Sequence, residues 1–345
     1  MQTESTKLTT WCCLHPLFPY TFYTIIMTIT HQPAPLSCSA SEAKPYNDYS
    51  TWIRQQFQFR VQKISVDAGF SCPNRDGHIS TGGCTFCDNR TFSPQYCGHG
   101  KSIRQQISEG KAFFARKYPD MKYLAYFQAY SNTYAPIDVL RRRYEEALET
   151  EDVVGLVIGT RPDAIDEEIL NYLAELNRQT FLIVEYGVES ANNDTLRRVN
   201  RGHTFECSQR AFTMTRERGI RTGGHIIIGL PGEDEAETLR QAPLISALDI
   251  DLLKIHQMQI IRGTRLAAEY TQQPFKLYTP DEYIRLVTAY VERLRKDIVI
   301  ERFVSQSPAH LLLAPKWHLK NHEFTDKLNN YMKATGAYQG RFFDK

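Results

Sequence analysis

Three cysteines lie close together in the stretch SCPNRDGHISTGGCTFC. Eleven residues separate Cys72 from Cys84, and two residues separate Cys84 from Cys87. Thiolates in a glycine-rich loop suit an iron-sulfur cluster, because glycine lets the backbone wrap closely and bring amides toward the sulfides. A structural cluster normally takes four thiolates, so three thiolates predict a cluster with one iron open to an exogenous ligand.

Zinc is the main alternative for the same loop. Cys84 and Cys87 form a C-x2-C pair, which is common in zinc sites. The further zinc ligands would come from Cys72, Cys97, His78 or His99. In that case the chain would be a zinc-binding interaction module without redox chemistry, and spacing alone leaves both metals open.

The composition is that of an ordinary globular protein. Of 345 residues, 42% are hydrophobic and 23% charged, and 41 basic against 39 acidic residues leave a net charge of +2. This nearly neutral charge does not indicate nucleic-acid binding, although it does not exclude a local basic patch. Eight cysteines are too few and too unevenly spaced for a disulfide scaffold, which favours metal chemistry in a reducing compartment.

The first segment differs from the rest of the chain. Residues 11–29 are apolar, but His15, Pro16 and Pro19 interrupt them, so they make a poor transmembrane helix. No clean cleavage site for a signal peptide follows. We therefore expect no membrane association and predict that residues 1–45 are a disordered or misassigned leader.

Short β-rich segments alternate with helical patterns from about residue 60, as in βα units around a parallel sheet. The predicted strands are residues 61–67, 123–128, 153–159, 181–187, 223–228 and 252–258. The predicted helices between them are residues 103–117, 137–148, 166–176, 205–218 and 235–246. A repeat of about 30 residues matches one βα unit.

The tail reads as a helix over 280–297, a short strand over 298–303 and a last helix near 321–332. The predicted fold is therefore α/β, a partial (β/α)6 barrel over residues 46–297 with a C-terminal α+β cap over residues 298–345.

A family resemblance extends well beyond the cysteines. The segments DAGFSCPNRDG, GGCTFCDN, YFQAYSNTYAP, IGTRPDAI, VEYGVES, VNRGH, GGHIIIGLPGE and LKIHQMQIIRGT resemble radical S-adenosylmethionine (SAM) proteins of the YhcC/YtqA type. That group is related to the catalytic subunit of elongator. The resemblance covers about residues 45–345 and implies a radical SAM barrel with a 4Fe-4S cluster on Cys72, Cys84 and Cys87.

The resemblance also implies residues that bind SAM at the carboxyl ends of the strands, where parallel barrels bind ligands. By resemblance, Phe86 contacts adenine, Gln128 receives the SAM amino group or the substrate, and Arg201 pairs with the SAM carboxylate. The remaining candidates are Glu189, Ile228 and Gly229. Phe86 has the alternative role of a loop anchor, and relatives often carry Gln at the position of Glu189. No catalytic residue is identified.

Polar side chains are also expected inside the barrel. Glu185 alternates with Glu189 along one strand, and two carboxylates on one buried face favour polar ligands over packing. His225, Lys254 and His256 should face inward from the next two strands. Lys254 is equally a substrate binder or a residue with an internal partner, and His256 is more typical of a satisfied core histidine.

The implied activity is reductive cleavage of SAM to a 5′-deoxyadenosyl radical that removes hydrogen from an unidentified substrate. Such a cluster needs an electron donor such as flavodoxin or ferredoxin and is destroyed by oxygen, so a cytoplasmic location is expected. Because the elongator subunit is a relative, RNA, and tRNA in particular, is a candidate substrate.

Overall fold

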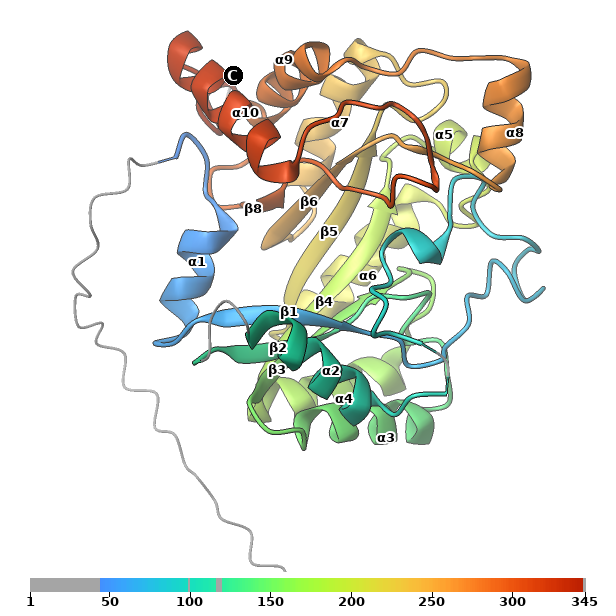
Figure 1. Cartoon of the computed structure of the whole chain (residues 1–345), viewed down its shortest axis with the longest axis vertical. Helices are drawn as coiled ribbons and strands as arrows, with labels where there is room; N and C mark the ends of the chain where they lie inside the picture. The colour runs from blue at the N-terminus through green and yellow to red at the C-terminus, as the bar shows by residue number, and fades with distance from the viewer. Residues whose placement is uncertain (1–43, 99, 116–119, 344–345) are drawn as a thin grey trace, which may run out of the picture. The chain divides into compact units, whose positions relative to one another are not determined.

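The computed structural model describes residues 44–98, 100–115 and 120–343, so the expected leader lies almost wholly outside the described residues. Within them, parallel strands form one seven-stranded sheet in the order β1-β2-β3-β4-β5-β6-β8. The strands are β1 (Val61–Val66), β2 (Lys122–Phe127), β3 (Val153–Thr160), β4 (Phe181–Glu189), β5 (Arg221–Ile228), β6 (Leu252–Gln257) and β8 (Val299–Arg302). Figure 1 shows the sheet curling into a half-barrel, which confirms the predicted fold.

All six predicted strands are present, each within two residues of its expected ends. The five predicted helices between them are α2 (Ile103–Ala115), α3 (Ile137–Leu148), α4 (Glu167–Gln179), α6 (Phe205–Arg216) and α7 (Glu235–Ser246). Local sequence sets where they begin. The Asp166 carboxylate accepts a hydrogen bond from the Ile169 amide at 2.8 Å, and two glutamates occupy the first turn of α4, where the helix dipole favours negative charge.

The two faces of the sheet are packed differently. Outward side chains such as Phe127 and Tyr186 join the helices in the main hydrophobic core. On the inward face a smaller apolar cluster includes Leu124, Val157 and Ile183, and Ile53 of helix α1 (Tyr49–Gln56) packs into it. Helix α1 therefore closes the half-barrel below the inward side chains.

The strand that the sequence predicts in the tail is part of the main sheet. It is β8, which pairs in parallel with β6 and extends the sheet beyond the six predicted strands. Its Ile300 amide also donates to the Asn47 carbonyl at 2.8 Å, just before α1. Lys63 of β1 and Glu301 of β8 form an ion pair at 2.6 Å, so the two edge strands of the sheet are joined across the barrel interior.

The rest of the tail packs around these strands (Figure 1). It contains α8 (Arg265–Gln272), α9 (Pro280–Val291), α10 (Asn321–Thr335) and an antiparallel pair, β7 (Ile260–Ile261) with β9 (Leu312–Ala314). Helix α9 ends at Val291, earlier than predicted, and beyond its end the Arg295 guanidinium donates to carbonyls of residues 246, 248 and 250. None of the helices in the described part of the chain has the length and apolar character needed to cross a membrane.

Candidate functional site

The three cysteines lie on the long connection from β1 to α2. The Arg75 amide donates to the Cys72 carbonyl at 2.8 Å, and the Cys87 amide donates to the Cys84 carbonyl at 3.2 Å, so each end of the cysteine loop forms a tight turn. Gly83 has φ of +77°, and a Cβ there would meet the Arg75 side chain at 2.9 Å. Glycine is needed at this position for both reasons.

The cysteine loop is fixed by the segment between α5 (Asn193–Arg198) and α6. The buried Asn74 amide donates to the Asn200 carbonyl at 2.7 Å and lies 3.6 Å from the Cys84 sulfur. Asn200 in turn donates to the Gly83 carbonyl at 2.9 Å. The Arg201 guanidinium lies 3.5 Å from the same Cys84 sulfur. Both donors are thus within reach of the sulfur of a predicted metal ligand, where such contacts orient the ligand.

Arg201 is held between the cysteine loop and the end of β4. It donates to the Gly187 carbonyl at 2.6 Å and lies 3.6 Å from the Glu189 carboxylate. A Cβ on Gly187 would meet the Glu189 carboxylate at 2.6 Å and the Arg201 guanidinium at 2.7 Å, so only glycine leaves room for both side chains. Glu189 itself has φ of +67°, a strained value for a non-glycine residue that is typical of functional sites.

One cavity of about 540 Å³ connects the cysteine loop to the barrel interior. The predicted ligands Cys72, Cys84 and Cys87 all line it. Of the predicted SAM contacts, Phe86, Gln128, Glu189 and Arg201 also line it. A volume in this range suits a small-molecule site.

Two predicted SAM contacts do not line this cavity. Ile228 is 2% exposed and belongs to the main core, and Gly229 lies against the Tyr278 ring. The neighbouring Ile227 lines the cavity in their place. Phe86 lines the cavity and also packs against the apolar cluster around Leu266, so both roles weighed for it have structural support.

Polar residues of the rim near β2 and β3 are mostly engaged with each other. Ser131 contacts Thr160 at 3.0 Å, and Asn132 donates to the Gly159 carbonyl at 2.7 Å, so both support the turn after β2. Arg161 forms a two-pronged ion pair with Asp163 at 2.6 and 2.8 Å. Gln128 remains directed at the cavity.

Deeper in the barrel lies a group of buried charges, here called the inner charge cluster: Lys63, Glu185, His225, Lys254 and Glu301. Glu185 accepts from Lys254 at 2.5 Å, from Lys63 at 3.0 Å and contacts His225 at 3.0 Å. Glu301 pairs with Lys63 at 2.6 Å and with Lys254 at 3.3 Å. Both carboxylates therefore have two lysine partners.

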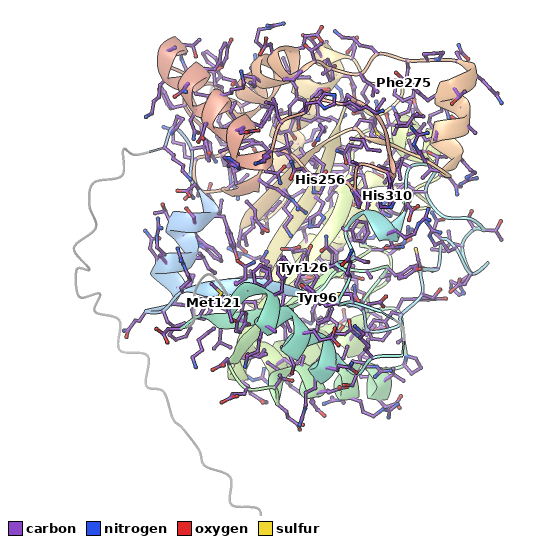
Figure 2. The ribbon with its side chains drawn as sticks, viewed as in Figure 1. Tyr96, Met121, Tyr126, His256, Phe275 and His310 are labelled. Atoms are coloured by element: carbon purple, nitrogen blue, oxygen red, sulfur yellow. The ribbon has the colours of Figure 1, made fainter. Side chains whose placement is uncertain are left out.

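Tyr126 and His256 lie beside the inner charge cluster. The Tyr126 hydroxyl is 2.9 Å from the Lys254 ammonium, and the His225 and His256 rings stack with centroids 5.7 Å apart. Figure 2 labels Tyr126 and His256, which come from different strands and lie near the centre of the curled sheet. The Nε2 atom of His256 is buried without a hydrogen-bond partner among the described residues, so the expectation of a satisfied core histidine is wrong.

Burial and neighbouring charge fix the protonation of the cluster. Burial and the nearby Lys254 ammonium lower the pKa of His225 to about 4, so its ring is neutral near pH 7. Burial opposes ionisation of Glu185, but Lys254, Lys63 and His225 hold its pKa well below the usual range. Burial lowers the pKa of Lys254 to about 8 despite both carboxylates.

Several site residues have no counterpart in the sequence predictions. Lys63 was missed although it occupies an inward position of the first predicted strand. Glu301 and Arg302 were missed because their strand was assigned to the cap rather than to the barrel wall. Asn74 lies inside the cysteine stretch itself, where its position beside the ligands was the available signal.

The geometry also bears on the alternative metal. The Cys97 thiol donates to the Ser65 carbonyl at 3.0 Å and does not line the cavity. In the part of the chain that the structure describes, no group of three or more His, Cys, Asp or Glu side chains is spaced for a single metal ion. His99, a candidate zinc ligand, lies outside the described residues. The three cysteines line one cavity, and the Asn74 amide and the Arg201 guanidinium lie beside the Cys84 sulfur.

Comparison with known proteins extends the resemblance. The Radical SAM superfamily model matches residues 76–241, and the Radical_SAM C-terminal domain model matches residues 250–334. YtqA of Bacillus subtilis is 36% identical over 303 residues, which cover 88% of this chain and 94% of YtqA. A tRNA uridine(34) acetyltransferase of Methanocaldococcus infernus is 26% identical over 189 residues, 51% of this chain and 35% of that protein.

The structure of elongator protein Elp3 from Methanocaldococcus infernus, with its N-terminus deleted, has a similar fold. The TM-score is 0.60 at 19% sequence identity, and the match covers 81% of this chain and 64% of that chain. At this identity the likeness concerns the fold, which is the half-barrel described above. Together with the matched segments and the three cysteines at the cavity, these findings show that the chain belongs to the radical SAM superfamily, in the group of YtqA and YhcC.

Proposed function

We propose that this chain is a radical SAM enzyme that binds a 4Fe-4S cluster through Cys72, Cys84 and Cys87. The observation that carries the proposal is that these three cysteines line the same cavity as Phe86, Gln128, Glu189 and Arg201. When bound, the cluster and SAM supply a 5′-deoxyadenosyl radical that abstracts hydrogen from a substrate.

The protein's own residues position and shield the reactants. Asn74 and Arg201 place donors beside the Cys84 sulfur, which stabilises thiolate charge and orients the ligand. In this proposal Arg201 exchanges its long contact with Glu189 for the carboxylate of SAM, and Gly187 leaves the space for that approach. Gln128 and the Ile227 side chain face the same space from opposite strands.

Ile228 and Gly229 keep a narrower proposed role. The Ile228 side chain packs in the main core and Gly229 has no side chain, but the strand that ends at Ile228 also carries Ile227, which lines the cavity. The proposed contact is therefore between the adenine of SAM and the backbone after β5. The Gly229→Ala variant, strained at φ of +91°, should weaken SAM binding, measured by calorimetry on the cluster-loaded protein.

Metal analysis distinguishes the proposal from a zinc module. Protein purified without oxygen should be brown and contain about four irons and four sulfides per chain once the cluster is reconstituted. Stoichiometric zinc in a colourless protein would instead support the interaction module. The need for a low-potential donor such as flavodoxin or ferredoxin, and the oxygen sensitivity of such clusters, support a cytoplasmic location.

RNA is the substrate class that the relatives favour. The matching tRNA uridine(34) acetyltransferase shares about half of this chain. We test tRNA by comparing modified nucleosides, by mass spectrometry, in tRNA from cells with and without the gene. A nucleoside that changes and is restored by the wild-type gene, but not by Cys84→Ala, supports tRNA. An identical nucleoside profile in both strains argues against it.

A further inference from the structure

The deep part of the cavity presents nitrogen atoms that lack partners. Arg302, at the end of β8, and His256, on β6, both line the cavity. The Nε atom of Arg302 and the Nε2 atom of His256 are buried without a hydrogen-bond partner in the described part of the chain. Among those residues, no carboxylate lies within ion-pair distance of the Arg302 guanidinium, although Glu301 is its neighbour in sequence.

An irregularity in the sheet explains how Arg302 reaches the interior. The register between β6 and β8 shifts after Leu253, so that Lys254 lies opposite Arg302 rather than Glu301. Neighbouring residues of a regular strand face opposite sides of the sheet, but a register shift can turn a side chain toward the other side. Glu301 can therefore pair with Lys63 and Lys254 while Arg302 also lines the cavity.

The charges in this region do not balance. Three cations, Lys63, Lys254 and Arg302, face two carboxylates, Glu185 and Glu301. His225 is neutral near pH 7, and burial together with the Arg302 charge lowers the pKa of His256 well below its usual value. One positive charge is thus without a counter-charge in a partly enclosed space, which is unfavourable unless a ligand supplies it.

The inner charge cluster does not need Arg302 for its own stability. Each of its carboxylates already has two lysine partners, and Glu185 has His225 as well. Arg302 adds charge without filling a vacant hydrogen bond of the cluster. A guanidinium is also the group best suited to bind planar oxyanions through two parallel hydrogen bonds.

The shape of the cavity limits which anion can reach Arg302. Below the inner charge cluster, the apolar side chains around Ile53 close the half-barrel. A group that ends a molecule can enter such a closed end, whereas a phosphodiester within a nucleic-acid chain continues on both sides. A single excess positive charge matches a carboxylate better than a phosphate dianion.

From these observations we propose that Arg302 and His256 form a subsite for a terminal carboxylate of the substrate. The proposal deepens the proposed function, because it rests on the substrate entering the same cavity as SAM. It adds to the proposed function the group that enters this end of the cavity: a carboxylate that ends a free molecule, or a side group of a larger one such as tRNA, near the hydrogen to be removed.

Fluorine NMR with three probes of similar shape tests this subsite. The probes are trifluoropropionate, its neutral amide and trifluoroethylphosphonate, added to cluster-loaded protein with excess SAM and no reductant. SAM occupies the open iron and Arg201, which leaves the deep subsite for the probe. We expect binding of the carboxylate, with the amide and the phosphonate each at least roughly tenfold weaker, as the loss of a charge-assisted bond implies.

Substitutions of Arg302 test whether this residue binds the carboxylate probe. Arg302→Gln should weaken the carboxylate probe roughly tenfold, and Arg302→Lys less, whereas Arg178→Gln, on the exposed surface of α4, should not change it. Thermal unfolding identifies any variant that fails to fold, and the comparison of probes on the wild type needs no variant. Equal binding of acid and amide, or carboxylate binding unchanged in a folded Arg302→Gln, would overturn the proposal. Stronger binding of the phosphonate would also overturn the proposal, because the subsite would then prefer a phosphate group to a carboxylate.

The readout separates this subsite from the radical chemistry. Binding of the probe is measured without reductant, so it does not depend on SAM cleavage. Carboxylate binding lost in Arg302→Gln, in a protein that never cleaves SAM, would support the subsite and contradict the proposed function. Cleavage of SAM by a protein that prefers the amide would support the proposed function and contradict the carboxylate subsite.

Discussion

The two ends of the cavity both hold buried charge, but they balance it differently. At the rim, two cations have carboxylate partners within the protein: Arg201 lies 3.6 Å from Glu189, and Arg161 is paired with Asp163. At the deep end, Arg302 has none among the described residues, while the lysines around it are fully paired. In the two proposals above, the rim binds the cofactor and the deep end receives an anion.

The largest expected effect is at the rim. Changing Cys72, Cys84 or Cys87 to Ala should each abolish the proposed 4Fe-4S cluster, since each change removes one of its three proposed thiolate ligands. Cys97→Ala is the matched control, because its thiol is bonded to the Ser65 carbonyl away from the cavity. Iron and sulfide content after anaerobic reconstitution is the measurement. Loss of iron in Cys97→Ala would show that the ligand set is wrong.

The next largest effect is a difference in stability between removing a paired cation and removing an unpaired cation at the deep end. Lys254→Met leaves Glu185 with less compensation in a buried site, and we expect a loss of about 3–5 kcal/mol in the free energy of unfolding. Arg302→Met removes an unpaired cation and should change stability by less than about 1 kcal/mol. Urea unfolding of both variants measures the difference. Equal losses would show that Arg302 has a structural partner after all.

A smaller effect is expected from Gly187→Ala at the rim. The new methyl group would meet the Glu189 and Arg201 side chains, and their displacement should cost about 1–3 kcal/mol. Because these side chains have to move, SAM affinity should fall as well, measured by calorimetry on the cluster-loaded protein. As a control, Gly98→Ala places a methyl group in open space without a positive φ. Unchanged SAM affinity in Gly187→Ala would exclude Arg201 from SAM binding.

The last effect concerns pH and His225, in the inner charge cluster. The pKa of His225 is lowered from 6.5 to about 4 in the folded protein, so the unfolded chain takes up a proton first as pH falls. The free energy of unfolding should therefore decrease between pH 6.5 and 4, by about 1 kcal/mol per pH unit from this residue. In His225→Asn that part of the slope should disappear. An unchanged slope in urea titrations of the cluster-free protein would mean that His225 is protonated when folded.

The sequence predicted the barrel because its signals are local and repeated. Each strand is a short β-rich run between helix patterns, and Asp166 shows how a single residue marks a helix start. The three candidate cysteine ligands were equally visible, since they lie within sixteen consecutive residues and the structure brings them to one cavity. The inner charge cluster was only partly visible: Glu185, His225 and Lys254 follow from strand alternation, but their partners do not.

Two physical reasons explain why the sequence did not predict the residues that face Glu185, His225 and Lys254. Lys63 and Glu301 are 238 residues apart and meet only because the sheet curls until its edge strands approach. Arg302 faces the cavity because of a register shift between β6 and β8, which strand alternation cannot predict. Ile228 and Gly229 were named from the family resemblance, whereas the regular alternation of β5 directs Ile227 to the cavity and Ile228 into the main core.

The most direct test of the account is SAM cleavage by the reconstituted protein. With dithionite and SAM under anaerobic conditions, wild-type protein should form 5′-deoxyadenosine, and Cys84→Ala should form none. Chromatography with mass detection measures the product, and iron analysis confirms that the cluster is present. No 5′-deoxyadenosine from protein with a complete cluster would contradict the assignment of a radical SAM enzyme.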